Sequence, residues 1–383
     1  MTMDRLFQLM KEKNASDMFF AVNSPVQIKI NGNLIPINQQ KLEPENIISL
    51  LSEVATPPQM EELLRENELN MGISVPNLGR FRLSAFRQRG SISAVFRFVP
   101  GNIPVLADLG LPPILADLIM EKRGLMLLVG ATGSGKSTTI ASMLDHRNEL
   151  RAGHILTLED PIEYLFKNKK SIVNQREIGS DAKDFYTALR NSMRQAPDCI
   201  LIGEIRDKET MAAALAYAQS GHLVLATLHA NNSYNALNRI ISFYPIENRG
   251  ALLNDLSSAV RAIVSQRLVR AAAGGPRHAA VEVMVNTRYI ADLIEKGEIN
   301  QIKEAMEKSL SPGSQSFETA LLNLVQTGAI TQEEALANAD SASNLLWLLN
   351  NGPDKGGPAE DEPMPTIKPD DDAPSFTEFV LNT

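Results

Sequence analysis

The sequence predicts an α/β fold in two parts, the second of which is a largely parallel sheet with helices on both faces. Three observations lead to this prediction. Gly130 to Ser137 reads Gly-Ala-Thr-Gly-Ser-Gly-Lys-Ser between an apolar run and a helical stretch, which is the phosphate-binding loop arrangement. From Gly124 onward, strands, loops and helices alternate, as is typical of parallel sheets. Before Pro100 the pattern is one of hairpins and short helices, which indicates a smaller α+β domain.

Residues 1–99 form the expected first domain. Asn31-Gly32 joins two short apolar runs and is a hairpin turn signal. Proline near the first turn marks the start of two of the helices. We expect helices at 5–12, 44–51 and 57–65, and strands at 26–30, 34–37, 80–86 and 91–98. Residues 100–113 are rich in Pro and Gly and are expected to form a linker or hinge, with a helix following to about residue 122.

The expected second domain covers residues 114–350. We expect its strands at 125–129, 154–158, 172–175, 199–202 and 223–227, and mostly helix from 248 to about 347. The tail, 351–383, has eight acidic residues from Asp354 onward against Lys355 and Lys368, and residues 352–374 contain almost no large apolar groups. It cannot bury enough surface to offset its ordering entropy, so it is expected to be disordered.

Composition narrows the function classes. The apolar fraction of 44% suits a globular protein, and the longest apolar runs fall far short of the roughly 20 residues that span a bilayer. The first ten residues lack a signal-peptide pattern, and the single Cys199 excludes a disulfide or a cysteine zinc site within the chain. A reducing cytoplasm is therefore expected. The net charge of −8 argues against a nucleic-acid partner, although much of it lies in the tail.

The glycine-rich loop is the strongest signal in the chain. Its glycines let successive backbone N–H groups converge, and the helix N-terminus that follows adds partial positive charge. Lys136 is expected to neutralise the β- and γ-phosphates, and Ser137 to ligate Mg²⁺. A chance glycine-rich connection is the weaker alternative. The expected binding residues for ATP are Gly130, Ala131, Thr132, Gly133, Ser134, Gly135, Lys136, Ser137 and Thr138.

Polar residues also follow three other expected strands. Because the carboxyl ends of parallel strands share one edge, these residues are candidates to hold a metal or a water. Glu159 and Glu163 follow the strand at 154–158, and a solvated acidic loop is the alternative. Glu204 follows Cys199–Ile202 and is the candidate to orient or deprotonate water, the alternative being an ion pair with Arg206 or Arg194.

His229 follows the strand at 223–227 and is placed to sense the γ-phosphate, with a purely structural role as the equal alternative. The first domain is rich in arginine between residues 80 and 97. A solvated basic face is the default interpretation, since Arg80 and Arg82 share one face of a strand. The alternative is that some of these side chains reach the γ-phosphate as arginine fingers.

Four ordered motifs resemble those of the secretion and type IV pilus ATPases. They are Gly-Ala-Thr-Gly-Ser-Gly-Lys-Ser, Leu-Glu-Asp-Pro-Ile-Glu from 158, Ile-Leu-Ile-Gly-Glu-Ile-Arg-Asp from 200 and Gly-His-Leu-Val-Leu-Ala-Thr-Leu-His-Ala-Asn from 221. They look like the Walker A, Asp box, Walker B and His box motifs of that family. The likeness runs from about residue 5 to about 345 and includes Ala-Ser-Asp at 15–17.

Within this family the chain resembles the PilT and PilU retraction branch, because one Cys cannot form the four-cysteine zinc module of most extension motors. Residues 226–232, 280–283 and 289–298, together with the acidic tail, look more like the PilU type. An Ala-Ile-Arg-Asn-Leu helix motif typical of the PilT type is not matched at Arg288–Ile294. This departure puts independent retraction in doubt and suggests an accessory motor that works with a PilT-type ring.

The resemblance implies a PAS-like N-terminal domain, a RecA-like C-terminal domain and a homohexamer with ATP between the domains. It implies that Glu204 is the catalytic glutamate, that Glu159 and Glu163 support metal or water, and that His229 links to the γ-phosphate. Arg82 and Arg97 match the arginine-finger positions. The implied partners are a PilT-type retraction ATPase and a PilC-like platform protein, reached from the cytoplasmic side of the inner membrane, at the pilus base, without membrane insertion.

Two other functions remain open on the sequence alone. A regulatory or scaffolding ring would need ATP binding more than hydrolysis, and the unmatched PilT-type helix motif favours it. A nucleic-acid translocase is the third hypothesis, since RecA-like rings also move DNA. The absence of a basic, aromatic-rich stretch in the sequence argues against it.

Overall fold

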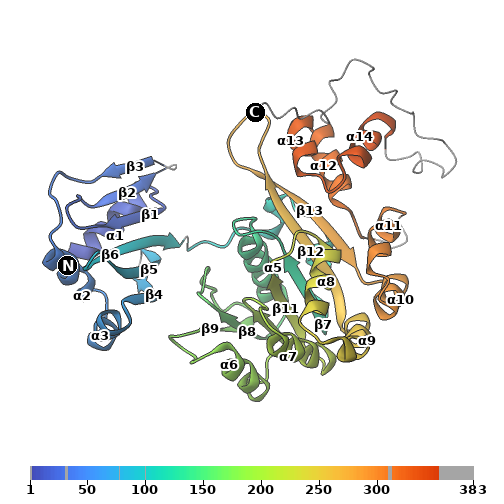
Figure 1. The fold of residues 1–383 in the computed structure, drawn as a ribbon, viewed down its shortest axis with the longest axis horizontal. Coiled ribbons are helices and arrows are strands. Elements are labelled where there is room, and N and C mark those ends of the chain that lie inside the picture. Colours follow the sequence, from blue (N-terminus) through green and yellow to red (C-terminus); the bar gives the residue numbers. More distant parts are fainter. Residues whose placement is uncertain (1, 31–32, 77, 100, 309–312, 353–383) are drawn as a thin grey trace, which may run out of the picture.

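The computed structural model describes residues 2–30, 33–76, 78–99, 101–308 and 313–352. It contains two β-sheets, one in each of two lobes that are joined by an extended connection (Figure 1). We call residues 2–99 the first lobe and residues 114–352 the second lobe. The predicted α/β class is confirmed, because the second sheet is largely parallel and carries helices on both faces. Residues 353–383, for which a disordered tail is predicted, lie outside the described residues.

The first lobe is a six-stranded antiparallel sheet in the order β3-β2-β1-β6-β5-β4. One face of the sheet is covered by helices, and the aromatic rings of Phe7 and Phe81 stack there with their centroids 4.1 Å apart. Its elements are α1 (Thr2–Glu12), β1 (Asp17–Phe20), β2 (Gln27–Ile30), β3 (Asn33–Pro36), α2 (Pro44–Ser52), α3 (Pro57–Glu66), β4 (Glu68–Val75), β5 (Gly79–Gln88) and β6 (Ser91–Val99).

Local sequence accounts for these elements. In α1 the buried residues Met3, Phe7 and Met10 are three to four positions apart, so they form one apolar face. Helices α2 and α3 each begin with proline and a capping box. Strands β1 and β4 were not predicted. β1 has no two-residue alternation, because Asp17, Met18 and Phe20 are all buried, and in β4 polar and small residues interrupt the pattern.

The second sheet has the strand order β13-β12-β7-β11-β10-β8-β9, and every neighbouring pair is parallel except β12 with β13. Its strands are β7 (Gly124–Val129), β8 (Gly153–Glu159), β9 (Ser171–Glu177), β10 (Cys199–Ile202), β11 (Leu223–Leu228), β12 (Val260–Val269) and β13 (His278–Val285). The helices of the lobe are α4 (Ile114–Leu118), α5 (Lys136–Leu150), α6 (Phe185–Ser192), α7 (Lys208–Gln219), α8 (Ser233–Ser242), α9 (Arg249–Ala259), α10 (Arg288–Lys296), α11 (Ile302–Glu307), α12 (Phe317–Gln326), α13 (Gln332–Asn338) and α14 (Ala342–Asn351).

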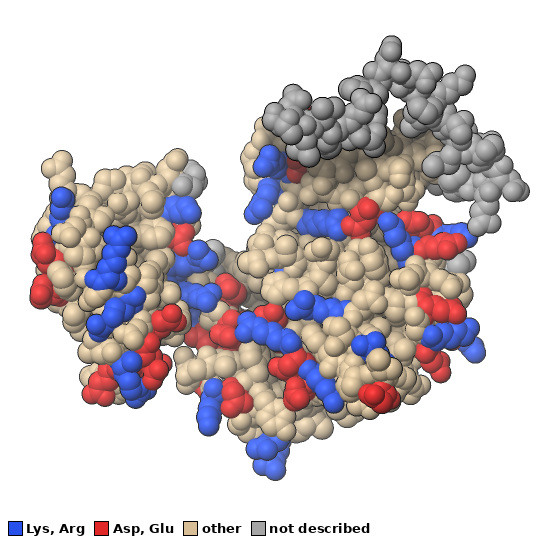
Figure 2. Space-filling model, viewed as in Figure 1, with Lys and Arg blue, Asp and Glu red and all other residues tan. Residues whose placement is uncertain are grey.

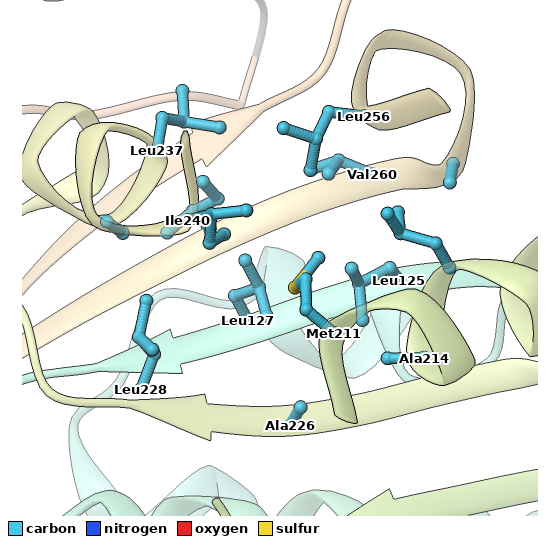
Figure 3. Packing of buried hydrophobic residues seen from close by; sticks show 14 of the residues in the cluster. Leu125, Leu127, Met211, Ala214, Ala226, Leu228, Leu237, Ile240, Leu256 and Val260 are labelled. Atoms are coloured by element: carbon cyan, nitrogen blue, oxygen red, sulfur yellow. The ribbon is translucent and has the colours of Figure 1, made fainter. Parts of the chain in front are cut away.

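Helices bury both faces of this sheet. On one face, Met211 of α7, Ile240 of α8 and Leu256 of α9 pack against alternate residues of β7 and β11 (Figure 3). On the other face, α4 and α5 cover the intervening residues, such as Met126 and Leu128 of β7. Because both faces are buried, the strands are almost continuously apolar, as predicted for strands at 125–129, 199–202 and 223–227.

The expectation of mostly helix from 248 onward was wrong for residues 260–285. β12 runs beside β7 in parallel, and β13 turns back along it in antiparallel register. The run Val260 to Val269 mixes apolar residues with Arg261, Gln266 and Arg267, which obscured any two-residue alternation. Tertiary pairing with a buried central strand therefore decided the conformation of this segment. The helix expected to reach residue 122 also ends earlier, at Leu118.

The chain returns to helices after β13. Helices α12, α13 and α14 enclose a small separate core that includes Phe317, Leu321 and Leu345 and packs on Val269 and Ala280 of the sheet. Of the helices in the described residues, none is long and apolar enough to cross a membrane.

Candidate active site

The glycine-rich loop connects β7 to α5. Gly130, Gly133 and Gly135 have φ values of +149°, +77° and +90°, a region that side-chain-bearing residues rarely adopt. Space is also limiting, because a Cβ on Gly130 would lie 2.6 Å from the Gln266 carbonyl oxygen. A Cβ on Gly135 would lie 2.6 Å from Nε2 of Gln266. The loop therefore lies tightly against β12 at two of its glycines, and the first turn of α5 follows directly with its unsatisfied N–H groups.

Lys136 opens α5 and turns back over the loop. Its Nζ donates hydrogen bonds to the carbonyl oxygens of Gly130, at 2.7 Å, and Ala131, at 2.8 Å. Burial lowers the pKa of the Lys136 ammonium, while the nearby Glu204 acts in the opposite direction. A partly buried cation that is held only by neutral carbonyls gains strongly from an anion. The loop thus presents a concentrated positive site for phosphate.

A cavity of about 130 Å³ opens on one side of α5, at the carboxyl ends of β8 and β10. Four predicted site residues from three separate segments meet there, namely Ser137, Glu159, Glu163 and Glu204. The expectation that strand ends would bring these residues together holds because β7, β11, β10 and β8 are parallel neighbours. The other residues lining the cavity are Ile140, Ala141, Asp160, Pro161, Tyr164, Phe166, Phe185, Leu201, Gly203, Arg206 and Thr227.

Glu159 ends β8 and is 8% exposed. Its Oε1 accepts hydrogen bonds from the Thr157 hydroxyl at 2.6 Å and from Nε2 of Gln175 at 3.2 Å. Burial raises the pKa of this carboxyl, and these hydrogen bonds offset only part of the effect. Glu159 is therefore a fixed, shielded group rather than part of a solvated acidic loop.

Glu159→Gln is expected to stabilise the folded chain increasingly as pH rises above the usual glutamate pKa of about 4.3. Because burial raises the pKa of Glu159, the folded state binds this proton more tightly than the unfolded state. As pH rises from the unfolded-state pKa toward the raised pKa of the folded state, ionisation of Glu159 lowers the free energy of unfolding of the parent. Glutamine does not titrate, so the variant lacks this loss. Urea unfolding of both proteins at several pH values measures the difference. A difference that shrinks with rising pH would contradict the assignment.

Glu204 follows β10 and its side chain is 20% exposed. Its Oε2 accepts a hydrogen bond from Nε of Arg206 at 2.7 Å, and its Oε1 lies 3.4 Å from Nε2 of His229. The ion pair with Arg206, one of the alternatives on the sequence, is thus present, and so is the proximity to His229. The two strand ends bearing Glu204 and His229 are also joined by a hydrogen bond from the Thr227 hydroxyl to the Gly203 carbonyl oxygen.

The arginines of the first lobe lie elsewhere. Nε of Arg97 donates a hydrogen bond to Oδ1 of Asp17 at 2.8 Å, and Arg82 is the cross-strand neighbour of Arg97. Neither arginine is among the residues that line the cavity. Arg80 instead forms an ion pair across the lobes with Glu177 at the end of β9. The Glu177 carboxylate also accepts a hydrogen bond at 3.0 Å from the backbone N–H of Ile162. Ile162 belongs to residues 158–163, which we call the acidic segment. No local pattern in the sequence predicts the contact between Arg80 and Glu177.

Sequence reasoning also missed two residues that support the loop. Gln266 of β12 accepts a hydrogen bond from the Thr139 hydroxyl at 2.8 Å and packs against two loop glycines. Its segment was expected to be helical, so no pattern pointed to it. Tyr164 shares a hydrogen bond of 2.8 Å with the Thr138 hydroxyl and thereby connects α5 to the acidic segment. Only its position two residues beyond Ile162 marked it as near the site.

The residues present fit a magnesium-bound triphosphate. Mg²⁺ usually keeps several waters and takes one or two protein oxygens together with phosphate oxygens. The exposed Ser137 hydroxyl at the start of α5, with carboxylates across the cavity, offers this type of coordination. In the part of the chain that the structure describes, His, Cys, Asp and Glu do not gather into a separate metal site. The glycines that leave room at the loop and the Lys136 ammonium supply the phosphate contacts.

Comparisons with known proteins agree with this architecture. The chain is 46% identical to the type IV pilus ATPase PilU of Pseudomonas aeruginosa over 352 residues, which is 92% of each chain. It is 36% identical to the type IV pilus retraction ATPase PilT of the same organism, over 90% of this chain and all of that one. The structure resembles that of the pilus retraction motor PilT with bound ADP, with a TM-score of 0.83 and 38% identity, covering 88% of this chain and 96% of that one.

The family described as Type II/IV secretion system protein matches residues 2–336, most of the chain. PilU and PilT, two of the relatives, are named as ATPases, and the phosphate-binding loop lies within the region that the family matches. The chain therefore belongs to the type II/IV secretion system protein family.

Proposed function

We propose that this protein is an ATP-hydrolysing motor of the type IV pilus machine, of the PilU type, which supports pilus retraction and twitching motility together with a PilT-type motor. One observation carries the proposal. The phosphate-binding loop, Glu159, Glu204 and His229 follow four neighbouring parallel strands and meet at one edge of the sheet. The similarity of nearly the whole chain to PilU and PilT directs this chemistry to the pilus.

Each residue at this edge takes a distinct role. Backbone N–H groups from Gly130 to Thr138 and the Lys136 ammonium bind the phosphates, and the Ser137 hydroxyl would hold Mg²⁺. When bound, Mg²⁺ supplies positive charge that offsets the negative charge of the phosphate oxygens. Glu204 orients the attacking water and accepts its proton. Glu159 and Glu163, which line the same cavity, support the metal and its waters.

His229 connects the state of the phosphate to Glu204. Its Nε2 is 3.4 Å from Oε1 of Glu204, and its side chain is 44% exposed, so it remains accessible to a phosphate oxygen. Arg206 holds the other oxygen of the same carboxylate. Glu204 is therefore oriented from both sides, and a water that approaches it meets a fixed acceptor.

The chain is divided, in this proposal, into a PAS-like domain (1–99), a hinge (100–113), a RecA-like ATPase domain (114–350) and an acidic tail (351–383). Six copies form a ring in which ATP lies between domains. Arg82 and Arg97 act as arginine fingers once the domains close or a neighbouring copy approaches. This requires the Arg97–Asp17 ion pair to open or to move as a unit, and the 63% exposure of the Arg97 side chain leaves it free to do so.

The ring works on the cytoplasmic side of the inner membrane at the pilus base, as a peripheral protein. Its partners there are a PilT-type retraction ATPase and a PilC-like platform protein. Nucleic acid is not an expected partner, since basic and acidic side chains are interspersed across the face of the second lobe shown in Figure 2. A nucleic-acid translocase is accordingly the least supported function.

Twitching in strains that lack this gene, its PilT-type partner, or both tests the proposal. Deleting this gene is expected to weaken retraction against load, because an accessory motor adds force to a partner that still works. Restoring the gene with the Lys136→Ala substitution is expected not to rescue that defect. Normal retraction under load in the single deletion would contradict the proposal.

A regulatory ring is the second candidate, and the pairing of both Glu204 oxygens favours it. A carboxylate whose two oxygens are both held by neighbouring side chains is less free to turn toward a water, which suits ATP binding with slow hydrolysis. In that case Glu204→Gln would restore retraction in the deletion strain nearly as well as the parent gene, whereas Lys136→Ala would not. A motor requires both residues.

A further inference from the structure

A cluster of polar groups joins helices α12–α14 to the sheet beside the phosphate-binding loop. Its centre is Arg267 of β12, whose guanidinium lies 3.8 Å from the ring centroid of Phe317 in α12. The guanidinium donates hydrogen bonds to the carbonyl oxygens of Asn338 and Asn231, the latter at 3.1 Å, and forms an ion pair with Asp340. Arg267 thus contacts the C-terminal helices and the segment after β11 at the same time.

Asp340 completes the connection with its second oxygen. Oδ2 accepts a hydrogen bond at 2.7 Å from Nδ2 of Asn232, which is 2% exposed. The other side-chain atom of Asn232, Oδ1, caps α8 by accepting from the N–H of Asn235 at 3.0 Å. The side chains of Asp340 and Arg267 are 13% and 22% exposed, so solvent screens this pair only partly.

The same segment borders the phosphate-binding loop. Asn231 lines one hollow with Gly130, Ala131 and His229, and a second hollow with the loop and Arg267. Gly130 also packs directly on the Gln266 carbonyl, one residue before Arg267. A change in backbone conformation at Gly130 and Ala131 would therefore alter their packing against both Asn231 and β12.

Phosphate supplies such a change. The Lys136 ammonium now bonds the carbonyls of Gly130 and Ala131, at 2.7 and 2.8 Å. A phosphate group is a far stronger partner for an ammonium than a neutral carbonyl, so it competes for these bonds. The released carbonyls then need new partners, and the residues that carry them lie against the segment that Arg267 and Asp340 hold.

We propose that Asp340 is a positioning residue that, through Arg267 and Asn232, couples occupancy of the phosphate-binding loop to the arrangement of helices α12–α14. The inference rests on the proposed nucleotide binding. The helices respond as a unit, because Phe317, which stacks on Arg267, belongs to the same small core as Leu345 of α14. The Asp340 bridge links these helices to the segment carrying His229, so a shift of that segment is passed on to them only while the bridge is intact.

The chain provides its own reporter for this coupling. Trp347, its single tryptophan, lies half-buried on α14, two residues beyond Leu345. In the full-length protein, Mg-ADP is expected to change Trp347 fluorescence. In Asp340→Asn the response is expected to shrink at least about fivefold, because the amide cannot pair with both Arg267 and Asn232 as the carboxylate does. Glu333→Gln, on the exposed side of α13, is the matched control and should respond like the parent.

A second variant separates coupling from folding. Arg267→Lys keeps the positive charge but loses the planar group that stacks on Phe317 and donates to several oxygens, so the fluorescence response should fall again. Thermal unfolding of each variant checks that it is folded, and equilibrium dialysis measures ADP binding independently of fluorescence. Should the parent fail to bind ADP in dialysis, the proposed function itself fails. If ADP binds while Trp347 responds equally in parent and Asp340→Asn, or not at all in the parent, only the coupling is overturned.

Discussion

Lys136→Ala is expected to lower kcat/KM for ATP hydrolysis by at least about 100-fold, the range typical for removal of a group that stabilises developing charge. Lys136 is the one side chain of the glycine-rich loop that brings a full positive charge, and burial already lowers the pKa of its ammonium. A bound anion therefore stabilises the Lys136 ammonium, and alanine removes the positive charge that attracts this anion. Colorimetric measurement of phosphate release over a range of ATP concentrations provides both kinetic constants.

Lys122→Ala is the matched control for that variant, since Lys122 is exposed and precedes the strand at its opposite end. It should hydrolyse ATP like the parent. Nucleotide binding is expected to weaken in Lys136→Ala, because the same ammonium serves the bound phosphates. If Lys136→Ala hydrolysed ATP as fast as the parent, the assignment of the glycine-rich loop as the ATP site would be wrong.

Glu204→Gln is expected to reduce kcat by about 10²- to 10⁴-fold, the usual effect of losing a general base. Glutamine keeps the size of the side chain and can still accept from Arg206, but it cannot take a proton from water. ADP binding should be retained, because Glu204 faces the cavity rather than the loop amides. Phosphate release, together with equilibrium dialysis of ADP, separates these two effects.

Two further variants make the test of Glu204 specific. Glu209→Gln removes a carboxylate from the exposed first turn of α7 and should leave kcat unchanged. Arg206→Ala removes the hydrogen bond that holds Oε2 of Glu204 and should lower kcat, because the carboxylate is then less firmly oriented toward the water. A Glu204→Gln enzyme as fast as the parent would assign water activation to another residue.

Much of the fold could be predicted where local sequence and tertiary environment agree. The strand at 199–202 is a short apolar run bounded by polar residues, and burial on both faces requires that composition. Helices α2 and α3 carried their own start signals in proline and capping residues. For the site, the order of motifs along parallel strands was sufficient to predict that Ser137, Glu159 and Glu204 would meet.

The remaining features depend on contacts that a local pattern does not encode. Residues 260–269 become a strand because β7 offers an open edge, and the mixed polarity of the segment is equally compatible with helix. Gln266 consequently had no visible role, although it supports two loop glycines. Arg80 and Arg82 share one face of β5, as predicted, but the expected solvated basic face was wrong for Arg80, which is 13% exposed and whose partner lies 97 residues away in another lobe.

The pairing of Arg80 with Glu177 connects the first lobe to the neighbourhood of the candidate active site. Both side chains are largely shielded, at 13% and 5% exposure, so separating them leaves a poorly solvated charge and carries a considerable cost. Any swing of the first lobe about its connection must disrupt this ion pair, and Glu177 also anchors Ile162, the residue beside Glu163. A displacement that separates Arg80 from Glu177 would therefore also disturb the chain next to Glu163, which lines the candidate site of the second lobe.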